Sequence, residues 1–250
     1  MKRILLILPL FLFIACTSEA QLDRTADKFD TDAGELRIQP VQHGTVALTW
    51  NGMSIYVDPW GGGAAFEGQP DPDLIFITDI HGDHLSAATL SELNTEGVIF
   101  IVPQAVADRM PDYKDQLMII DNGETMNVEG IEVTAIPMYN LPETEDSRHT
   151  KGRGNGYILN MGGKQVYFSG DTEDIPEMRN LENIDIAFVC MNLPYTMDIN
   201  QAASAVLDFE PAIVYPYHHR GQDIQEFKEN VVSENNNIEV RLKNWYPESE

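Results

Sequence analysis

Residues 79–84 carry four side chains that are common metal ligands in proteins. The stretch reads D-I-H-G-D-H, so two imidazoles and two carboxylates fall within six positions of a chain that has only six histidines. Imidazole and carboxylate ligands suit zinc, iron and manganese. Because side chains alternate along an extended segment, Asp79, His81 and Asp83 can point the same way, and His84 follows at the turn. The stretch therefore predicts a metal site, although one loop alone does not close it.

The remaining ligands must come from distant parts of the chain. Asp171 follows the apolar stretch 165–169, and His218 follows the apolar stretch 212–215, so each comes just after an expected buried strand. Both side chains are suited to meet the loop 79–84 at one edge of a sheet. The alternative is that the loop carries ordinary solvated residues, and the two ligand-type side chains at strand ends argue against it.

The elements on either side of the loop are expected to hold it in place. Leu74–Thr78 is a short continuous apolar run, which predicts a strand buried on both faces. Ser86 is a favourable N-cap for a following helix, and Leu85 and Leu90 occupy the positions of a hydrophobic staple. The loop therefore connects a buried strand to the N-terminus of a helix.

The rest of the chain is expected to fold as one domain over residues 35–250, rich in strands. Asn51-Gly52 predicts a tight hairpin, since both residues tolerate positive φ, and apolar residues have helical spacing over 202–209. The expected strands are 46–50, 54–57, 74–78, 98–102, 117–120, 131–136, 157–160, 165–169, 184–189 and 212–215.

The order of these motifs resembles that of the metallo-β-lactamase-fold hydrolases, in particular the branch that contains L-ascorbate-6-phosphate lactonase. The family's first motif, His-x-His-x-Asp-His, is matched by residues 79–84 except at its first position. Its bridging aspartate is matched by Asp171 in Gly-Asp-Thr, and its last histidine by His218. His43 in His-Gly-Thr and Asp58 in Val-Asp-Pro are similar to the same branch.

The resemblance spans residues 36–245 and implies an α/β fold of the αββα type. In this four-layer sandwich, two sheets pack between helices, and a cleft for two metal ions lies at one edge of the sheets. The resemblance implies that the second metal site is complete in this chain, with Asp83, His84, Asp171 and His218 as its ligands.

The first metal site implied by the resemblance is altered in this chain. Asp79 stands where the family has a histidine, and Asn140 is the nearest equivalent of a further family histidine. His149 is the alternative to Asn140. The first site would thus contain His81, the shared Asp171, and Asp79 with one of these two residues. Asp79 either binds the metal through its carboxylate or hydrogen-bonds a ligating histidine.

Such a site is expected to hold one or two divalent ions, with zinc as the first expectation and manganese or iron as alternatives. A metal of this kind activates water at neutral pH. Asp83 and His84 are the expected catalytic residues, with Asp83 holding the nucleophile or acting as its base. The resemblance implies hydrolysis of a lactone or other ester, or of a phosphodiester. The alternative is a non-catalytic metal- or ligand-binding protein with a degenerate site, which the departures at Asp79 and Asn140 favour.

Four further residues are candidates for contacts with substrate or with the metal ligands. Arg153 lies in the cationic segment K-G-R-G-N-G of an otherwise acidic chain and would receive an anionic substrate group. A flexible surface loop fits the same segment. His43, Asp58 and His219 would contact the substrate or hydrogen-bond a metal ligand, and a plain structural role is the alternative for each histidine.

The chain is strongly acidic, with 16 lysines and arginines against 40 aspartates and glutamates and a net charge of −24. A surface of this charge repels phosphate backbones, which argues against nucleic acid as a partner. It also argues against a basic membrane-binding patch, so membrane contact is expected only through a lipid. The expected partner is a small-molecule or lipid substrate, and the sequence does not indicate the oligomeric state.

Residues 1–15 have the pattern of a secretory signal peptide. Two cationic residues precede an apolar run that is too short to span a bilayer, and the run ends at Ile14-Ala15-Cys16, which resembles a bacterial lipoprotein box. Cys16 is the expected site of lipidation, and residues 16–34 are an expected flexible tether. The sequence thus predicts export and lipid anchoring to a bacterial membrane, on its periplasmic or surface side. The alternative is an ordinary signal peptide.

Overall fold

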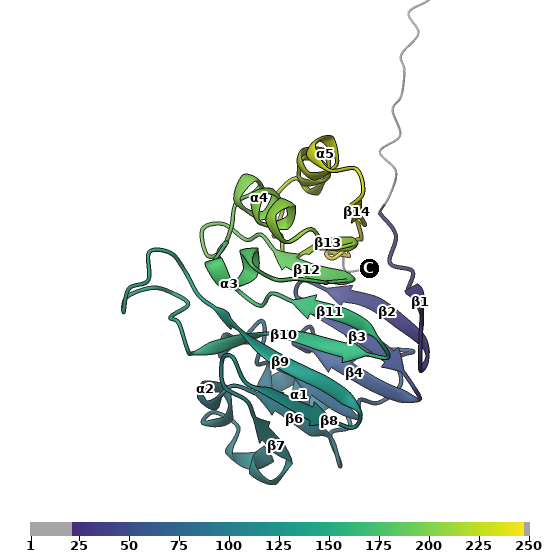
Figure 1. The fold of residues 1–250 in the computed structure, drawn as a ribbon. Coiled ribbons are helices and arrows are strands. Elements are labelled where there is room, and N and C mark those ends of the chain that lie inside the picture. The colour runs from purple at the N-terminus through teal and green to yellow at the C-terminus, as the bar shows by residue number, and fades with distance from the viewer. Residues whose placement is uncertain (1–21, 248–250) are drawn as a thin grey trace, which may run out of the picture.

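The structure, a computed structural model, describes residues 22–247 (Figure 1). The expected signal peptide 1–15 and the lipidation site Cys16 lie outside these residues. Within residues 22–247, none of the helices has the length and hydrophobicity needed to span a membrane.

The predicted tether, residues 16–34, includes residues that the structure places in the folded domain. Residues Asp27–Thr31 form strand β1, which pairs antiparallel with Gly34–Gln42 (β2). Lys243 is buried, and its Nζ lies 3.0 Å from a carboxylate oxygen of Asp23 and 3.0 Å from one of Asp27. The domain therefore begins before residue 35, because these contacts fix the segment that was predicted to be flexible.

Within the described residues, fourteen strands form two seven-stranded sheets that pack face to face (Figure 1). The first sheet follows chain order: β1, β2, β3 (Thr45–Trp50), β4 (Met53–Val57), β5 (Leu74–Phe76), β6 (Ile99–Val102) and β7 (Leu117–Ile119). The second sheet has the order β14 (Glu239–Val240), β13 (Ile213–Tyr217), β12 (Ile186–Cys190), β11 (Lys164–Phe168), β10 (Gly154–Met161), β9 (Ile131–Met138) and β8 (Thr125–Val128).

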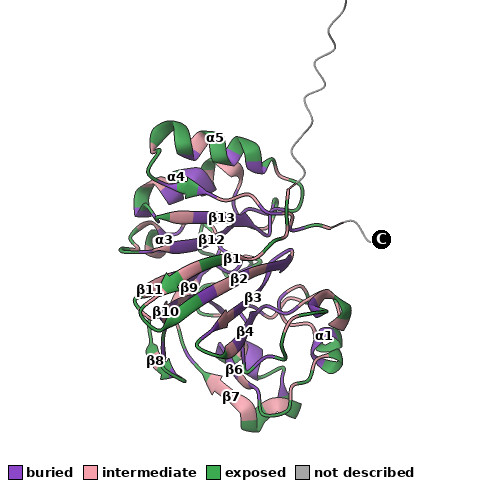
Figure 2. Cartoon of the chain, turned by 90° about the vertical axis from the view of Figure 1, so that its right-hand side faces the viewer, coloured by how far each residue is buried: buried purple, intermediate pink, exposed green. Residues whose placement is uncertain are grey.

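Helices cover the outer face of each sheet, which confirms the predicted four-layer αββα sandwich (Figures 1 and 2). The second sheet packs against the helices that follow β11, β12 and β13, and the first against the two that follow β5 and β6. The helices are α1 (Ala87–Glu92), α2 (Gln104–Ala107), α3 (Pro176–Arg179), α4 (Ile199–Phe209) and α5 (Ile224–Glu234), with 3₁₀ turns at Gly63–Phe66 and Pro111–Gln116.

Aromatic side chains fill the core of the second sheet. The ring of Phe188 stacks on Phe168 at a centroid distance of 4.7 Å and on Tyr215 at 4.8 Å. All three side chains are buried, in agreement with the buried strand interiors in Figure 2. Such close packing resists movement, so the strands provide a rigid frame for the loops at their ends.

The two halves of the fold bring their strand ends to one edge. Strands β4 to β7 run parallel, and so do β11 to β14. Because the carboxyl ends of parallel strands lie at the same edge, the loops after β5, β11 and β13 can meet there. The loop after β5 is held as predicted, since β5 is fully buried and Thr89 N donates to the N-cap Ser86 Oγ at 3.2 Å.

Candidate metal centre

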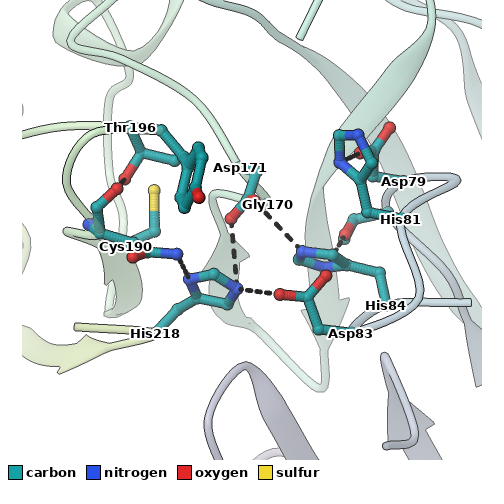
Figure 3. Close-up of polar contacts among 12 residues, drawn as sticks. Asp79, His81, Asp83, His84, Gly170, Asp171, Cys190, Thr196 and His218 are labelled. Carbon is teal, nitrogen blue, oxygen red and sulfur yellow. Dashed lines mark hydrogen bonds and ion pairs between the residues drawn. The ribbon is translucent and has the colours of Figure 1, made fainter. Parts of the chain in front are cut away.

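Histidines and aspartates from five separate loops converge at this edge. Figure 3 shows Asp83, His84, Asp171 and His218 pointing toward one another, with Asp79 and His81 beside them. Three sets of side chains each place their ligand atoms within 4.8 Å of one another. Two of them share His218: one is His84, Asp171 and His218, and another is His43, Asp83 and His218. The third set is Asp79, His81 and His149. The structure thus brings the predicted ligands together, and His149, the alternative to Asn140, joins them.

The set at His84, with Asp83 beside it, corresponds to the predicted second metal site. His84 Nε2 lies 3.3 Å from Asp171 Oδ2, and His218 Nε2 lies 3.5 Å from Asp171 Oδ1. Asp83 Oδ2 is 3.6 Å from His218 Nε2. Asp171, His84 and His218 are buried, whereas the Asp83 side chain is 24% exposed. Asp83 therefore faces the opening of the site.

A buried carboxylate fixes the orientation of His84. The Nδ1–H group of His84 donates to Asp58 Oδ2 at 2.7 Å, and Asp58 also accepts hydrogen bonds from the backbone N–H and the hydroxyl of Thr78. With Nδ1 bound to Asp58, Nε2 is the nitrogen that faces Asp171 and that would bind a metal. Asp58, predicted to contact substrate or a ligand, therefore has the second of these roles.

The set at His81 corresponds to the altered first site. His81 Nδ1 lies 2.5 Å from Asp79 Oδ2, and His149 Nε2 lies 3.9 Å from the same oxygen. His149 Nε2 is also 3.3 Å from Asp171 Oδ2. Asp171 therefore connects this set to the set at His84.

The structure distinguishes the two candidates for the missing family histidine. Asn140 Oδ1 accepts from the backbone N–H of His149 at 2.8 Å and lies 3.1 Å from His149 Nδ1. Its amide nitrogen donates to Glu173 and to the carbonyl oxygen of Tyr195. Asn140 thus holds the loop that carries His149, and His149 alone of the two reaches the cluster.

Five buried ligand atoms in this cluster make no well-aligned hydrogen bond within residues 22–247, although each lies 2.5–3.5 Å from a group of opposite charge. Buried polar atoms without partners are rare in folded proteins, and these face a common space lined by imidazole and carboxylate groups. This donor set suits a divalent ion such as zinc, manganese or iron. The atoms are His81 Nδ1, His84 Nε2, His149 Nε2, His218 Nε2 and Asp171 Oδ1.

The cluster favours ionised carboxylates. Burial alone would raise the pKa of Asp171, but the charges of His218 and His84 outweigh it and hold this pKa well below its usual value. Burial likewise opposes ionisation of Asp83, and its interactions with His218 and His43 lower its pKa nonetheless. For His84, burial would lower the pKa, but the charges of Asp171 and Asp58 raise it. Metal binding at this histidine therefore releases a proton.

His43 supports Asp83 from the turn between β2 and β3. His43 Nε2 lies 3.2 Å from Asp83 Oδ2, and its Nδ1 lies 2.7 Å from the hydroxyl of Tyr246. The Tyr246 hydroxyl accepts from the backbone N–H of Arg220 at 2.7 Å, so it can donate its own proton to His43 Nδ1. His43 Nε2–H then donates to Asp83. Tyr246 was missed in the sequence because no motif surrounds it.

Two other candidates do not occupy the expected positions. His219 lies outside the cluster, packs edge-on against Tyr246 with ring centroids 4.8 Å apart, and has a pKa that burial lowers to about 4. Arg153 was predicted to receive an anionic substrate group. Its guanidinium instead binds the Asp79 carboxylate, with Nε 3.1 Å from Oδ1 and Nη2 3.0 Å from Oδ2.

Three residues around the site adopt left-handed backbone conformations. His43 has φ 54°, Asp58 has φ 46° and His218 has φ 48°. Non-glycine residues seldom take such angles, and those that do concentrate at functional sites, where the surrounding structure enforces them. The backbone at the site is therefore held in an unfavourable conformation to aim these side chains.

Replacing Asp58 tests its orienting role. We expect Asp58→Asn to lower metal affinity about 10- to 100-fold, the usual cost of losing such a partner, because the amide no longer accepts strongly from His84 Nδ1–H. Metal titration of the purified chain measures this. Asp73→Asn is the matched control, since Asp73 also accepts a backbone N–H bond, from Ser54, but lies outside the cluster. Equal affinities in wild type and Asp58→Asn would contradict the assignment.

Comparison with known proteins places this geometry among metal-dependent hydrolases. The family model described as "Beta-lactamase superfamily domain" matches residues 37–218. A UPF0173 metal-dependent hydrolase of Methanopyrus kandleri is 26% identical over 219 residues, covering 82% of this chain and 95% of the relative. Another from Thermoplasma acidophilum is 30% identical over 158 residues, covering 61% and 68%.

Solved structures show the same similarity. A crystal structure of a candidate metal-dependent hydrolase from Parabacteroides distasonis has a TM-score of 0.80 and 36% identity, and the match covers 89% of this chain and 99% of that one. The metallo hydrolase Igni18 from Ignicoccus hospitalis has a TM-score of 0.72 and 25% identity, with 85% and 96% covered.

Proposed function

The chain belongs to the metallo-β-lactamase superfamily and is a metal-dependent hydrolase of it, and we propose that it cleaves a lactone or other ester, or a phosphodiester, at the cluster around Asp171. The observation that carries this proposal is the convergence of buried imidazole nitrogens and carboxylate oxygens that make no well-aligned hydrogen bond within the described residues. We propose zinc as the bound ion, with manganese or iron as alternatives.

The residues of the cluster would divide the work. A bound divalent ion supplies Lewis acidity and an activated water for hydrolysis. Asp83 is the carboxylate nearest the opening, so it is placed to orient the attacking water and to accept its proton. His43 holds Asp83 in position through the 3.2 Å contact, and Asp58 holds His84. Burial of Asp171, His84 and His218 excludes bulk water from the other side.

We propose that the chain is related to the L-ascorbate-6-phosphate lactonase branch, and that it shares the type of reaction with this branch. His43 and Asp58, which carry that resemblance, both support ligand-type residues of the cluster. A lactone is thus the first substrate class to test. A phosphodiester is the second, because a membrane-anchored protein would meet phospholipids.

Hydrolysis assays on the full chain separate these classes. The panel contains lactones of several ring sizes, aryl esters and bis(p-nitrophenyl) phosphate, each with added zinc or manganese. We expect turnover of the lactone or of the phosphodiester, its loss after chelation, and its return when metal is added. A preparation that holds metal tightly and cleaves nothing in the panel would favour the non-catalytic alternative, which the Asp79–Arg153 ion pair at the first site supports.

We propose separately that the chain is exported and anchored through lipidated Cys16. The support is the sequence of residues 1–16 alone. The archaeal origin of the curated relatives named above weighs against a bacterial lipoprotein. Labelling of a bacterial expression host with a fatty-acid analogue tests this. Incorporation into wild type and not into Cys16→Ser would support the anchor, and absence from both would contradict it.

A further inference from the structure

Arg153 and Asp79 form a two-point ion pair at the edge of the first metal subsite, the set Asp79, His81, His149 and Asp171. Both carboxylate oxygens are engaged, with Nε 3.1 Å from Oδ1 and Nη2 3.0 Å from Oδ2. The Asp79 side chain is 0% exposed and that of Arg153 is 19% exposed. Paired N–H donors in this geometry bind a carboxylate strongly and in a fixed orientation.

The loop backbone is built to deliver this arginine. The N–H of Asn155 donates to the carbonyl oxygen of Thr78, the residue before Asp79, at 2.9 Å. Gly154 packs so closely there that a Cβ would lie 2.7 Å from that same carbonyl oxygen and 2.6 Å from Met138 Cε. Arg153 and Asp79 are therefore held opposite each other by the backbone as well as by charge.

The pair also balances the charge of the subsite. Asp79 stands where the resembled family has a neutral imidazole, and an aspartate paired with an arginine has the same net charge of zero. Without Arg153, three carboxylates, those of Asp79, Asp83 and Asp171, would border the cluster with no arginine or lysine bound to any of them within the described residues. The guanidinium thus offsets the extra negative charge at position 79.

A cation and Arg153 must share the same carboxylate. Asp79 Oδ2 accepts from Arg153 Nη2 and also lies 2.5 Å from His81 Nδ1, the ligand-type atom of this subsite. A metal ion bound here would approach an oxygen already held by a positive group. The second metal subsite, made of Asp83, His84, Asp171 and His218, has no such arginine contact among the described residues.

We propose that Arg153 is a positioning residue that holds Asp79 and weakens the first metal subsite, so that the second subsite fills first. This inference rests on the metal binding of the proposed function. The arginine and the ion compete for Asp79, so each weakens the binding of the other. Removing the arginine must therefore make the ion bind more tightly. It must also destabilise the metal-free protein, since a buried carboxylate is left without a cation.

Manganese titration of the full chain, followed by the electron paramagnetic resonance signal of free Mn²⁺, tests the proposal. We expect wild type to show one tighter and one weaker equivalent. In Arg153→Gln the weaker equivalent should bind about ten-fold tighter, a typical size for such coupling. The metal-free variant should melt at a lower temperature than wild type, and manganese should raise its Tm by more. Arg153→Lys, which keeps the charge, should behave more like wild type.

Two controls separate this effect from a general change of charge. Lys151→Gln removes a cation from the same loop, but Lys151 pairs with Glu177 at 2.8 Å and does not contact Asp79, so its titration should match wild type. Asp79→Asn should lose the weaker manganese equivalent. The double variant with Asp79→Asn and Arg153→Gln should bind manganese no more tightly than Asp79→Asn alone. Unchanged or weaker manganese binding in Arg153→Gln would overturn this inference and leave the proposed function standing. Wild type that binds no manganese or zinc would overturn the proposed function and this inference with it.

Discussion

Asp171→Asn is expected to lose metal from both subsites and nearly all hydrolytic activity. Among residues 22–247, Asp171 is the one carboxylate within 4 Å of histidines of both metal subsites, at 3.3 Å from His84, 3.3 Å from His149 and 3.5 Å from His218. Asparagine keeps the size of the side chain but removes the negative charge and one acceptor. The loss of affinity should exceed the roughly 100-fold that a residue supporting a ligand contributes, because Asp171 is itself placed as a shared ligand.

Metal content and hydrolysis rate, measured on the same preparation, check this expectation. Asp174→Asn is the matched control, because Asp174 lies three positions away and pairs with Arg179 at 2.6 Å instead of entering the cluster. A circular dichroism melt establishes that both variants fold. Wild-type metal content in Asp171→Asn would refute a shared role for this carboxylate.

His149→Ala is the second change with a large expected effect. His149 Nε2 lies in the first subsite without a partner, so its removal should abolish the weaker metal equivalent and leave the tighter one on Asp83, His84, Asp171 and His218. Asn140→Ala removes only the residue that orients His149, and about a 10- to 100-fold loss of affinity at the first subsite is expected from it.

Metal titrations of the two variants rank the residues directly. We expect His149→Ala to lose one metal equivalent completely and Asn140→Ala to bind that equivalent more weakly. The hydrolysis rate should fall further in His149→Ala than in Asn140→Ala. The reverse ranking would make Asn140 the ligand and His149 a structural neighbour. A variant with both changes should behave like His149→Ala alone, since both act on one subsite.

The local part of the site could be predicted from the sequence because its signals are local. The apolar run before the loop 79–84 specifies a buried strand, and Ser86 specifies the following helix start, as the hydrogen bond from Thr89 N confirms. Asp171 and His218 were predicted to belong to the metal site because each follows an expected buried strand. Parallel strands bring such ends to one edge, and the structure has this arrangement.

The long connection between β9 and β10 could not be predicted in the same way. Residues 140–153 have no periodic pattern, so nothing in the sequence separates Asn140 from His149 as the inward-facing residue. The outcome depends on hydrogen bonds of the Asn140 side chain to the His149 N–H and to the Tyr195 carbonyl oxygen. The partner of Arg153 was equally hidden, because Asp79 lies far away in the sequence.

Contacts from the chain ends were also missed. The hydroxyl of Tyr246 reaches His43 because the carbonyl oxygen of Trp245 accepts the His43 N–H at 2.8 Å. The polar composition of residues 16–34 predicted a tether, yet β1 forms there because Lys243 and the open edge of β2 hold it. Both features depend on tertiary pairing between segments at opposite ends of the chain.

The metal content of the full chain decides whether the cluster around Asp171 is a metal centre. The protein is purified without chelator, and zinc, manganese, iron and nickel are quantified per chain before and after reloading with metal. We expect one tightly held equivalent of metal per chain and a second that is gained on reloading. A chain that holds no metal even after reloading would show that the cluster around Asp171 is not a metal centre.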